Sequence, residues 1–481
     1  MCGFEGPDPD PPGEHSGAPG LPGAMGLAVS DGAQARPTVS AAAKTVLKRT
    51  PAAAAHVAPP RSMDRTSGQG RARRTSYAAR RRLRGSADPL PACQIDAQGA
   101  DQAGRLHLAH PNGTVFEFGT PPLWPLDDSM RDAWFDGLPY FLQDLRPAGF
   151  MGRQFARAHA RALQLGDDPR QWSDDDVLHA ISIHGSDQSG NLVVGEQAFR
   201  LWLDQTQQSP ALVEEPRVLE IYSESASRAM EDGQAGSSTA GEFPKFTALR
   251  LLDGTPTRVI VTFSGSDNSP GTQRWSDLLV CEHLAAQTLA TLPGLTASTA
   301  SILRAGNRTF LEVVRFDRHG ARGRSALCSW TALNYGWFGL AGRPWTEGAA
   351  KLLERALIDR ETSQAITRLW HFGLLIANTD MHDGNLSFMP RISAAPRLAL
   401  APAYDMLPML YAPQRGVELP PVNFAPRLPL PAEREAWQAA AATAVQFWSR
   451  AADDDRISAQ FRTVCADNAQ AVHAARQHFK T

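Results

Sequence analysis

Three oxygen-bearing side chains in the C-terminal third of the sequence have the types and spacing that phosphoryl transfer needs. Asp380 and Asn385 stand five residues apart, and Asp405 follows twenty residues after Asn385. A carboxylate can take up the proton of an attacking hydroxyl group. Magnesium requires hard oxygen ligands and usually binds one or two carboxylates together with nucleotide phosphates. The pattern therefore predicts Asp380 as a catalytic base, with Asn385 and Asp405 as magnesium ligands.

The elements that must hold these side chains can be predicted on either side of the motif. Two short strands are expected after it, at 386–388 and 398–400, joined by a turn between Pro390 and Pro396. This order of helix, loop, hairpin and Asp is that of a protein-kinase catalytic loop. A loop rich in Asn, Asp and Gly is often only a turn, but the joint fit of three side chains favours a site. Apolar residues at helical spacing predict the preceding helix: Ile366, Leu369, Trp370, Gly373, Leu374 and Ala377.

A second segment has the composition of a phosphate-binding loop. Residues 236–246 read Gly-Ser-Ser-Thr-Ala-Gly-Glu-Phe-Pro-Lys-Phe and precede an expected strand. Small residues allow backbone N–H groups to approach phosphate oxygens. Most Gly/Ser segments are plain linkers, so the composition alone leaves both interpretations open.

Whole-chain properties limit the function classes. The 481 residues can form two or three domains, and 48 Lys and Arg nearly balance 50 Asp and Glu. No apolar run is long enough to span a membrane, so no membrane partner is expected. The five cysteines lack metal-binding spacing, which argues against zinc and a disulfide framework and predicts a cytoplasmic protein. They are Cys2, Cys93, Cys281, Cys328 and Cys465.

The sequence resembles a known family at these motifs. Asn-Thr-Asp-Met-His-Asp-Gly-Asn, ending at Asn385, and Leu-Ala-Pro-Ala-Tyr-Asp-Met-Leu-Pro, containing Asp405, resemble the HipA family of serine/threonine kinase toxins. The resemblance runs from about Leu106 to the C-terminus. It implies ATP as the phosphate donor and the same roles for Asp380, Asn385 and Asp405. His382 is expected to brace the loop, because imidazole is a poorer magnesium ligand than oxygen.

The resemblance also assigns the glycine-rich loop. The family has a Ser, then Ala-Gly, then a Lys before an apolar strand, which matches Ser238, Ala240, Gly241 and Lys245. In the family, phosphorylation of the serine that Ser238 matches silences the enzyme. A phosphate there would place about two negative charges where the phosphates of ATP must lie.

One departure from the family concerns the nucleotide side. The strand Val-Ile-Val-Thr-Phe-Ser carries Thr262 where related kinases have a Lys that pairs with ATP phosphates and with a Glu on the next helix. Glu282 is the candidate for that Glu. An unpaired inward carboxylate is costly, so Lys245 and Arg315 are the cations that could replace the missing Lys. The alternative is that Glu282 simply faces water.

The N-terminal region has a different character. Residues 1–30 are expected to be disordered, because they contain little to bury. Between Arg61 and Ser86 there are nine Arg and one Asp, a net charge of about +8. The helix expected at 41–49 and a basic hairpin at 68–84 resemble the recognition helix and wing of a winged helix-turn-helix. Its first helix has no counterpart, so a solvated or RNA-binding tail is an equal alternative.

These features predict an α+β chain with a bilobal protein-kinase-like fold and an extra N-terminal subdomain, preceded by a disordered or degenerate basic region. The expected parts are a disordered tail (1–30), an Arg-rich region that could form a degenerate winged helix-turn-helix (31–90), the N-terminal subdomain (106–230), a small lobe (231–320) and a helical large lobe (321–481).

Two main functions follow from these predictions. The first is a HipA-like toxin kinase that uses ATP and Mg²⁺ on a protein substrate, such as a translation component, and pairs with a helix-turn-helix antitoxin. The second is a transcriptional regulator that binds DNA through the Arg-rich region and has a weak or inactive kinase-like domain. A metabolite kinase is a third alternative, because the catalytic geometry does not choose between hydroxyl groups.

Overall fold

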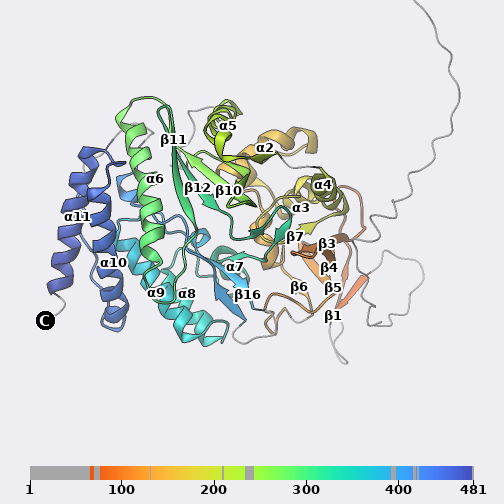
Figure 1. Cartoon of the computed structure of the whole chain (residues 1–481). Coiled ribbons are helices and arrows are strands. Elements are labelled where there is room, and N and C mark those ends of the chain that lie inside the picture. The colour runs from red at the N-terminus through yellow and green to blue at the C-terminus, as the bar shows by residue number, and fades with distance from the viewer. Residues whose placement is uncertain are drawn as a thin grey trace, which may run out of the picture. The chain divides into compact units, whose positions relative to one another are not determined.

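The computed structural model describes residues 66–69, 76–130, 132–208, 211–232, 243–391, 397–414, 419 and 422–478 (Figure 1). The chain divides into compact units at 1–44 and 45–481, and every described residue belongs to the second unit. The expected tail at 1–30 and the expected helix at 41–49 therefore lie outside the described residues. So do Ser238, Ala240 and Gly241 of the expected glycine-rich loop.

The Arg-rich segment contains a hairpin. Strand β1 (Thr66–Gln69) pairs antiparallel with β2 (Ser76–Ala79), so Gly68 lies opposite Tyr77. A hairpin was predicted at 68–84, and the one observed begins slightly earlier, at Thr66, and ends at Ala79. Beyond β2, Arg81 and Arg84 form ion pairs with Asp175 and Asp176.

An antiparallel sheet with the strand order β6-β5-β4-β3-β7 forms the core of the N-terminal subdomain. Helices accompany this sheet, and the start of α3 is stabilised by a reciprocal capping box between Ser173 and Asp176. The sheet starts at Leu90, earlier than residue 106, where the composition first suggests a globular domain. Its elements are β3 (Leu90–Ile95), β4 (Ala100–Ala109), β5 (Gly113–Phe118), β6 (Trp134–Phe135) and β7 (Leu192–Val194), with η1 (Tyr140–Leu145), α2 (Gly149–Leu163), η2 (Pro169–Gln171), α3 (Asp174–His184) and α4 (Glu196–Gln207).

A second five-stranded sheet, with the order β11-β12-β10-β9-β8, forms the small lobe. Alternating Val259, Val261 and Phe263 bury one face of β10 against Tyr222 of α5. The elements are β8 (Leu212–Val213), η3 (Glu215–Arg217), α5 (Val218–Asp232), β9 (Lys245–Leu252), β10 (Thr255–Phe263), α6 (Pro270–Leu289), β11 (Ala300–Ala305) and β12 (Arg308–Val314). A short hairpin follows, made by β13 (Arg318–His319) and β14 (Gly323–Arg324).

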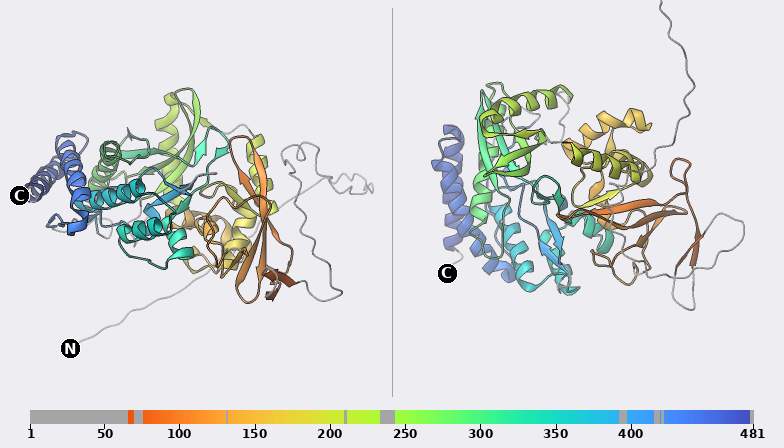
Figure 2. Two further views of the ribbon diagram at one scale, coloured as in Figure 1. Left: turned by 90° about the horizontal axis from the view of Figure 1, so that it is seen from below. Right: turned by 45° about the vertical axis from the view of Figure 1, so that its right-hand side comes forward.

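Helices dominate the large lobe. Helices α10 and α11 lie side by side, and α10 also packs on α9 and α6 (Figures 1 and 2). The strands expected at 386–388 and 398–400 are present as the antiparallel pair β16 and β17. The elements are β15 (Cys328–Ser329), α7 (Trp330–Trp337), α8 (Trp345–Glu354), α9 (Arg360–Leu375), η4 (Asp383–Asn385), β16 (Ser387–Pro390), β17 (Leu398–Leu400), η5 (Met409–Tyr411), η6 (Pro431–Glu433), α10 (Arg434–Asp453) and α11 (Ala459–His478).

The segment from Trp330 to Trp345 forms α7 and the start of α8. The Ser329 side chain accepts a hydrogen bond from the N–H of Ala332 and caps α7. Trp330 and Trp345 are each 1 % exposed, so burial of their rings stabilises helices that the composition alone does not favour.

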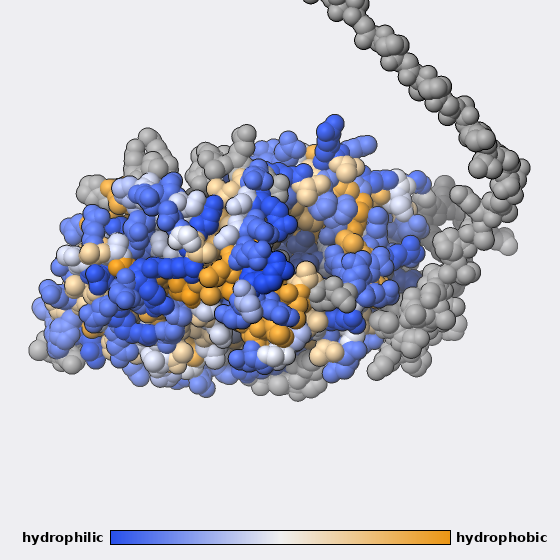
Figure 3. Space-filling model, turned by 45° about the horizontal axis from the view of Figure 1, so that its top comes forward, coloured by the Kyte–Doolittle hydropathy of each residue, from blue (hydrophilic) through white to orange (hydrophobic). Residues whose placement is uncertain are grey.

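Hydrophobic side chains fill the interior of each lobe, and the surface is mixed. The face shown in Figure 3 is mostly hydrophilic, with hydrophobic residues gathered in a band across its middle. In the parts of the chain that the structure describes, the helices fall short of the length and apolarity that a membrane crossing requires.

Candidate active site

The loop after α9 is held by two buried asparagines. The Oδ1 atom of Asn378 accepts a hydrogen bond from the N–H of Asp380 (3.0 Å), and Nδ2 of Asn385 donates to the Asp380 carbonyl oxygen (2.8 Å). Asn378 and Asn385 are only 3 % and 6 % exposed, whereas Asp380 is exposed. The backbone of Asp380 is thus fixed from both sides while the residue itself remains accessible to a substrate.

Asn378 also connects this loop to Asp405. Nδ2 of Asn378 also donates to the carbonyl oxygen of Asp405 (3.2 Å). Asp405 has a φ of 53°, a left-handed conformation that non-glycine residues adopt at a cost of about 1 to 3 kcal/mol. Such strain is retained where the surroundings over-determine it, often at functional sites. A chain of hydrogen bonds therefore runs from Asn385 through Asp380 and Asn378 to Asp405.

These residues offer oxygen ligands of the kind that magnesium prefers. Because Nδ2 of Asn385 is engaged by Asp380, Oδ1 is the atom of that amide that remains for a cation. Among the described residues, no three His, Cys, Asp or Glu side chains gather in a group that could hold a metal. A metal at this site would thus rely on Asn385, Asp405 and oxygens of a bound nucleotide.

Three further side chains shape the loop. Nδ1 of His382 accepts a hydrogen bond from the N–H of Gly384 (3.0 Å), the bracing geometry expected for this residue. The Tyr404 hydroxyl donates to the Gly384 carbonyl oxygen (2.6 Å). Asn334 of α7 donates to the Asp383 carboxylate (3.0 Å). Asn334, Asn378 and Tyr404 were not predicted as site residues, although Asn378 and Tyr404 lie within the motifs themselves.

On the small-lobe side, the structure places Lys245 directly beside the position of the missing Lys. Lys245 on β9 and Thr262 on β10 are cross-strand partners. Directly opposite residues of two strands project from the same face of a sheet, with their Cβ atoms about 4.5 to 5.5 Å apart. Thr262 is 7 % exposed and contributes no charge. The Lys245 side chain therefore projects from the strand next to that of Thr262, at the position directly opposite it.

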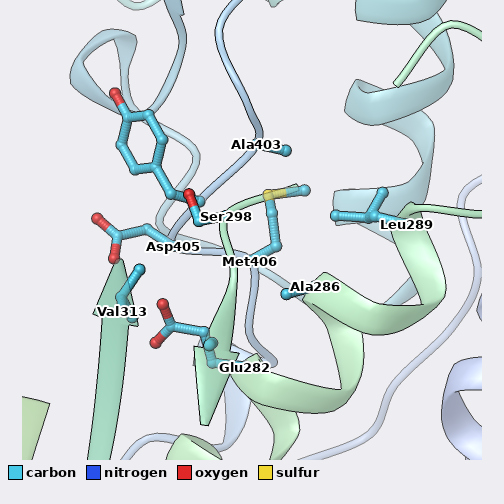
Figure 4. Close-up of a pocket in the computed structure, with 10 residues that line it drawn as sticks. Glu282, Ala286, Leu289, Ser298, Val313, Ala403, Asp405 and Met406 are labelled. Atoms are coloured by element: carbon cyan, nitrogen blue, oxygen red, sulfur yellow. The ribbon is translucent and has the colours of Figure 1, made fainter. Parts of the chain in front are cut away.

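Glu282 of α6 lies next to Asp405. Figure 4 shows both carboxylates on the same side of a small cavity of about 10 Å³, which they line with Met406 and other residues. Burial and, secondly, the Asp405 charge raise the pKa of Glu282 to about 8, against the opposing effects of the Lys245 charge and a hydrogen bond from the Asp405 N–H. Glu282 thus faces the site rather than bulk water.

Arg315, the other proposed substitute, is committed elsewhere. Its guanidinium binds the Asp317 carboxylate through two bonds of 3.0 Å and reaches Asp187 at 3.5 Å. Asp317 also pairs with Arg318, as expected of a structural ion pair. Lys245 is thus the remaining candidate of the two.

Comparison with protein families gives two matches along the chain. Residues 86–203 match the middle domain of YjjJ-like toxins, and residues 237–476 match the HipA-like C-terminal domain. The toxin YjjJ of Escherichia coli strain K12 is 36 % identical over 406 residues, which cover 84 % of this chain and 88 % of that protein.

A solved structure shares the fold at much lower identity. HipA of Shewanella oneidensis MR-1, in a complex with HipB and its operator DNA, aligns with a TM-score of 0.51 at 15 % identity. That alignment covers 81 % of this chain and 97 % of HipA. The proinflammatory kinase CtkA of Helicobacter pylori aligns over 50 % of this chain and 93 % of its own, with a TM-score of 0.34 at 12 % identity.

Proposed function

Because the chain belongs to the HipA-like toxin family and has a kinase-like fold, we propose that it is a serine/threonine protein kinase that uses ATP and magnesium. The observation that carries this proposal is the hydrogen-bonded chain from Asn385 through Asp380 and Asn378 to Asp405. It connects the proposed base, Asp380, to the proposed metal ligands, Asn385 and Asp405, in the loops that follow α9 and β17. Such preorganisation is the main contribution that a protein makes to phosphoryl transfer.

In the proposed reaction, Asp380 takes the proton of a serine or threonine hydroxyl. The hydroxyl oxygen forms a bond to the γ-phosphorus of ATP, and the bond from that phosphorus to the β,γ-bridging oxygen breaks, which releases ADP. Asn385 and Asp405 would hold magnesium, which neutralises charge on the phosphate oxygens. Asn378 and Tyr404 keep the loop in place while the proton moves.

Lys245 is proposed to supply the charge that Thr262 lacks. Its cross-strand position beside Thr262 and its electrostatic effect on Glu282 support this assignment. A Lys side chain has four methylene groups, so it can reach across to the phosphates from an adjacent strand. In this arrangement Glu282 pairs with Lys245 once magnesium has compensated Asp405.

The test is transfer of labelled γ-phosphate from ATP to protein hydroxyls, with Asp380→Asn and with Asp204→Asn, an exposed Asp on α4, as the matched control. Loss of a general base costs about 100- to 10,000-fold in rate. We expect Asp380→Asn to lower the rate of label transfer by a factor within that range, and we expect the control to keep the rate of the natural chain. Equal labelling by both variants would contradict the assignment of Asp380.

A second candidate function is a DNA-binding regulator with a weak kinase. The hairpin of β1 and β2 within the Arg-rich segment favours it, because such a wing can lie along phosphates. Salt-dependent binding to operator DNA together with an absence of label transfer would support this alternative.

The kinase proposal also includes a helix-turn-helix antitoxin as partner, a protein substrate and a cytoplasmic location. The structure of HipA with HipB and DNA supports the antitoxin partner.

A further inference from the structure

A second cavity lies away from the candidate active site. Its volume is about 530 Å³, within the range of small-molecule sites. It is formed where the end of α4, the start of β10 and the β13–β14 hairpin meet. Neither Asp380 nor Asp405 contributes to its wall, so the proposed catalysis leaves this cavity without a role.

Positive charge dominates the wall. The lining includes four arginines (Arg258, Arg318, Arg322 and Arg324) and one carboxylate, Asp187. Trp202 adds an aromatic surface. An enclosed space with this excess of guanidinium groups attracts anions.

Two carboxylates near the wall are shared among the guanidinium groups. Asp187 lies 2.9 Å from Arg318, 3.5 Å from Arg315 and 3.8 Å from Arg324, so one carboxylate is shared by three cations. Asp317 is the other carboxylate of the cluster, and it pairs with Arg315 and Arg318. Three buried arginines thus share two carboxylates.

Two of these arginines retain donors without acceptors. Nε of Arg318 and Nη1 of Arg324 are buried and have no hydrogen-bond partner, although the two side chains are only 1 % and 5 % exposed. Burial, together with repulsion from Arg318, lowers the pKa of Arg324 to about 9. Because three buried guanidinium charges share two carboxylate charges, an additional anion in the cavity would stabilise this cluster.

We propose that this cavity binds a small ligand through a phosphate group. A phosphate presents several acceptor oxygens to convergent arginines, which bind it through paired N–H donors. The remaining volume, with Trp202 on one side, accommodates the rest of the ligand. Asp187 sets a limit on how much negative charge the site accepts.

The test measures binding of pyrophosphate to the full chain by calorimetry, in the presence of EDTA. The variants Ala211→Glu and Ala211→Gln form a matched pair, because Ala211 is exposed on the cavity wall and the two differ in charge alone. We expect Ala211→Glu to weaken binding about tenfold or more relative to Ala211→Gln. Equal affinity of the two variants would overturn the proposal.

Removal of a wall cation gives an independent readout. Arg322→Gln should weaken pyrophosphate binding about tenfold, while Arg343→Gln, at an exposed Arg of another surface, should not. A phosphoserine peptide measured in parallel distinguishes a free phosphorylated molecule from a phosphorylated side chain. Failure of both probes to bind, or binding that Arg322→Gln leaves unchanged, would refute the site.

Discussion

The two sides of the candidate active site differ in how closely their residues match the pattern of a protein kinase. On the large-lobe side, the proposed site residues Asp380, Asn385 and Asp405 are linked by hydrogen bonds that run through Asn378. On the small-lobe side, Thr262 replaces the expected Lys, and Lys245 stands across from it on the next strand. The large-lobe side has the residue types expected of a kinase at the expected sequence positions. On the small-lobe side, the positive charge comes from a different strand but from the same face of the sheet.

Physical requirements explain this difference. A base and metal ligands must be held within a fraction of an ångström, so each needs its own backbone position. Neutralising a phosphate needs only a positive charge within reach, and a flexible Lys can supply it from more than one strand. The nucleotide side can therefore change its sequence more freely than the catalytic loop.

The largest effect that would test this comparison comes from Lys245. We expect Lys245→Thr to lower kcat/KM for ATP about 100-fold or more, because removal of one preorganised charge typically costs that much. Thr262→Lys in the Lys245→Thr background should restore most of the activity, since it returns the charge to the neighbouring strand. The measurement is steady-state phosphoryl transfer by the two single variants and the double variant.

The control for this exchange is Lys351→Thr, at an exposed Lys on α8. It should leave kcat/KM for ATP unchanged. Full activity in Lys245→Thr would show that catalysis does not need the positive charge on β9. The small-lobe side would then lack both the expected Lys and a functional substitute for it.

The sequence predicts the local parts of this site and misses the parts that depend on distant contacts. Spacing alone places Asp380, Asn385 and the strands β16 and β17, because all of them lie within one short segment. It cannot reveal the support from Asn334, which comes from α7, 49 residues before its partner Asp383. Nor can it show that Arg315 is engaged by Asp187, 128 residues earlier in the chain.

A similar limit applies to the fold. The helix α9 was predicted because its apolar residues recur at helical spacing along the sequence. The segment with Trp330 and Trp345 has no such repeat, and only tertiary burial reveals its helices. Strand β3, which starts the sheet of the N-terminal subdomain, likewise gains one of its two partners from the distant strand β7.

A smaller effect should follow from loss of the Tyr404 hydroxyl on the large-lobe side. It donates to the Gly384 carbonyl oxygen and can accept from Ser387, at 2.6 and 2.7 Å. Tyr404→Phe should lower the free energy of unfolding by about 1 to 2 kcal/mol and reduce the transfer rate about tenfold. Denaturant unfolding and phosphoryl transfer measure both.

Tyr335→Phe is the matched control, since Tyr335 is 58 % exposed on α7. It should change neither quantity. If Tyr404→Phe retained full activity with lowered stability, the hydroxyl would support the fold of the loop without positioning Asp380.

A pH dependence is expected at the contact between the two sides of the site. Burial and the Asp405 charge raise the pKa of Glu282 from 4.5 to about 8, so the folded state binds a proton that the unfolded state releases. Without magnesium, stability should therefore fall as pH rises from about 4.5 to 8. Glu282→Gln removes this group, so the melting temperature of that variant should decline less over this pH range. Glu435→Gln, at an exposed position of α10, should follow the natural chain.

Magnesium bound by Asp405 would compensate the Asp405 charge and reduce the difference between Glu282→Gln and the natural chain. Identical pH profiles for Glu282→Gln and the natural chain without magnesium would mean that burial and the Asp405 charge do not raise the pKa of Glu282 in the folded state.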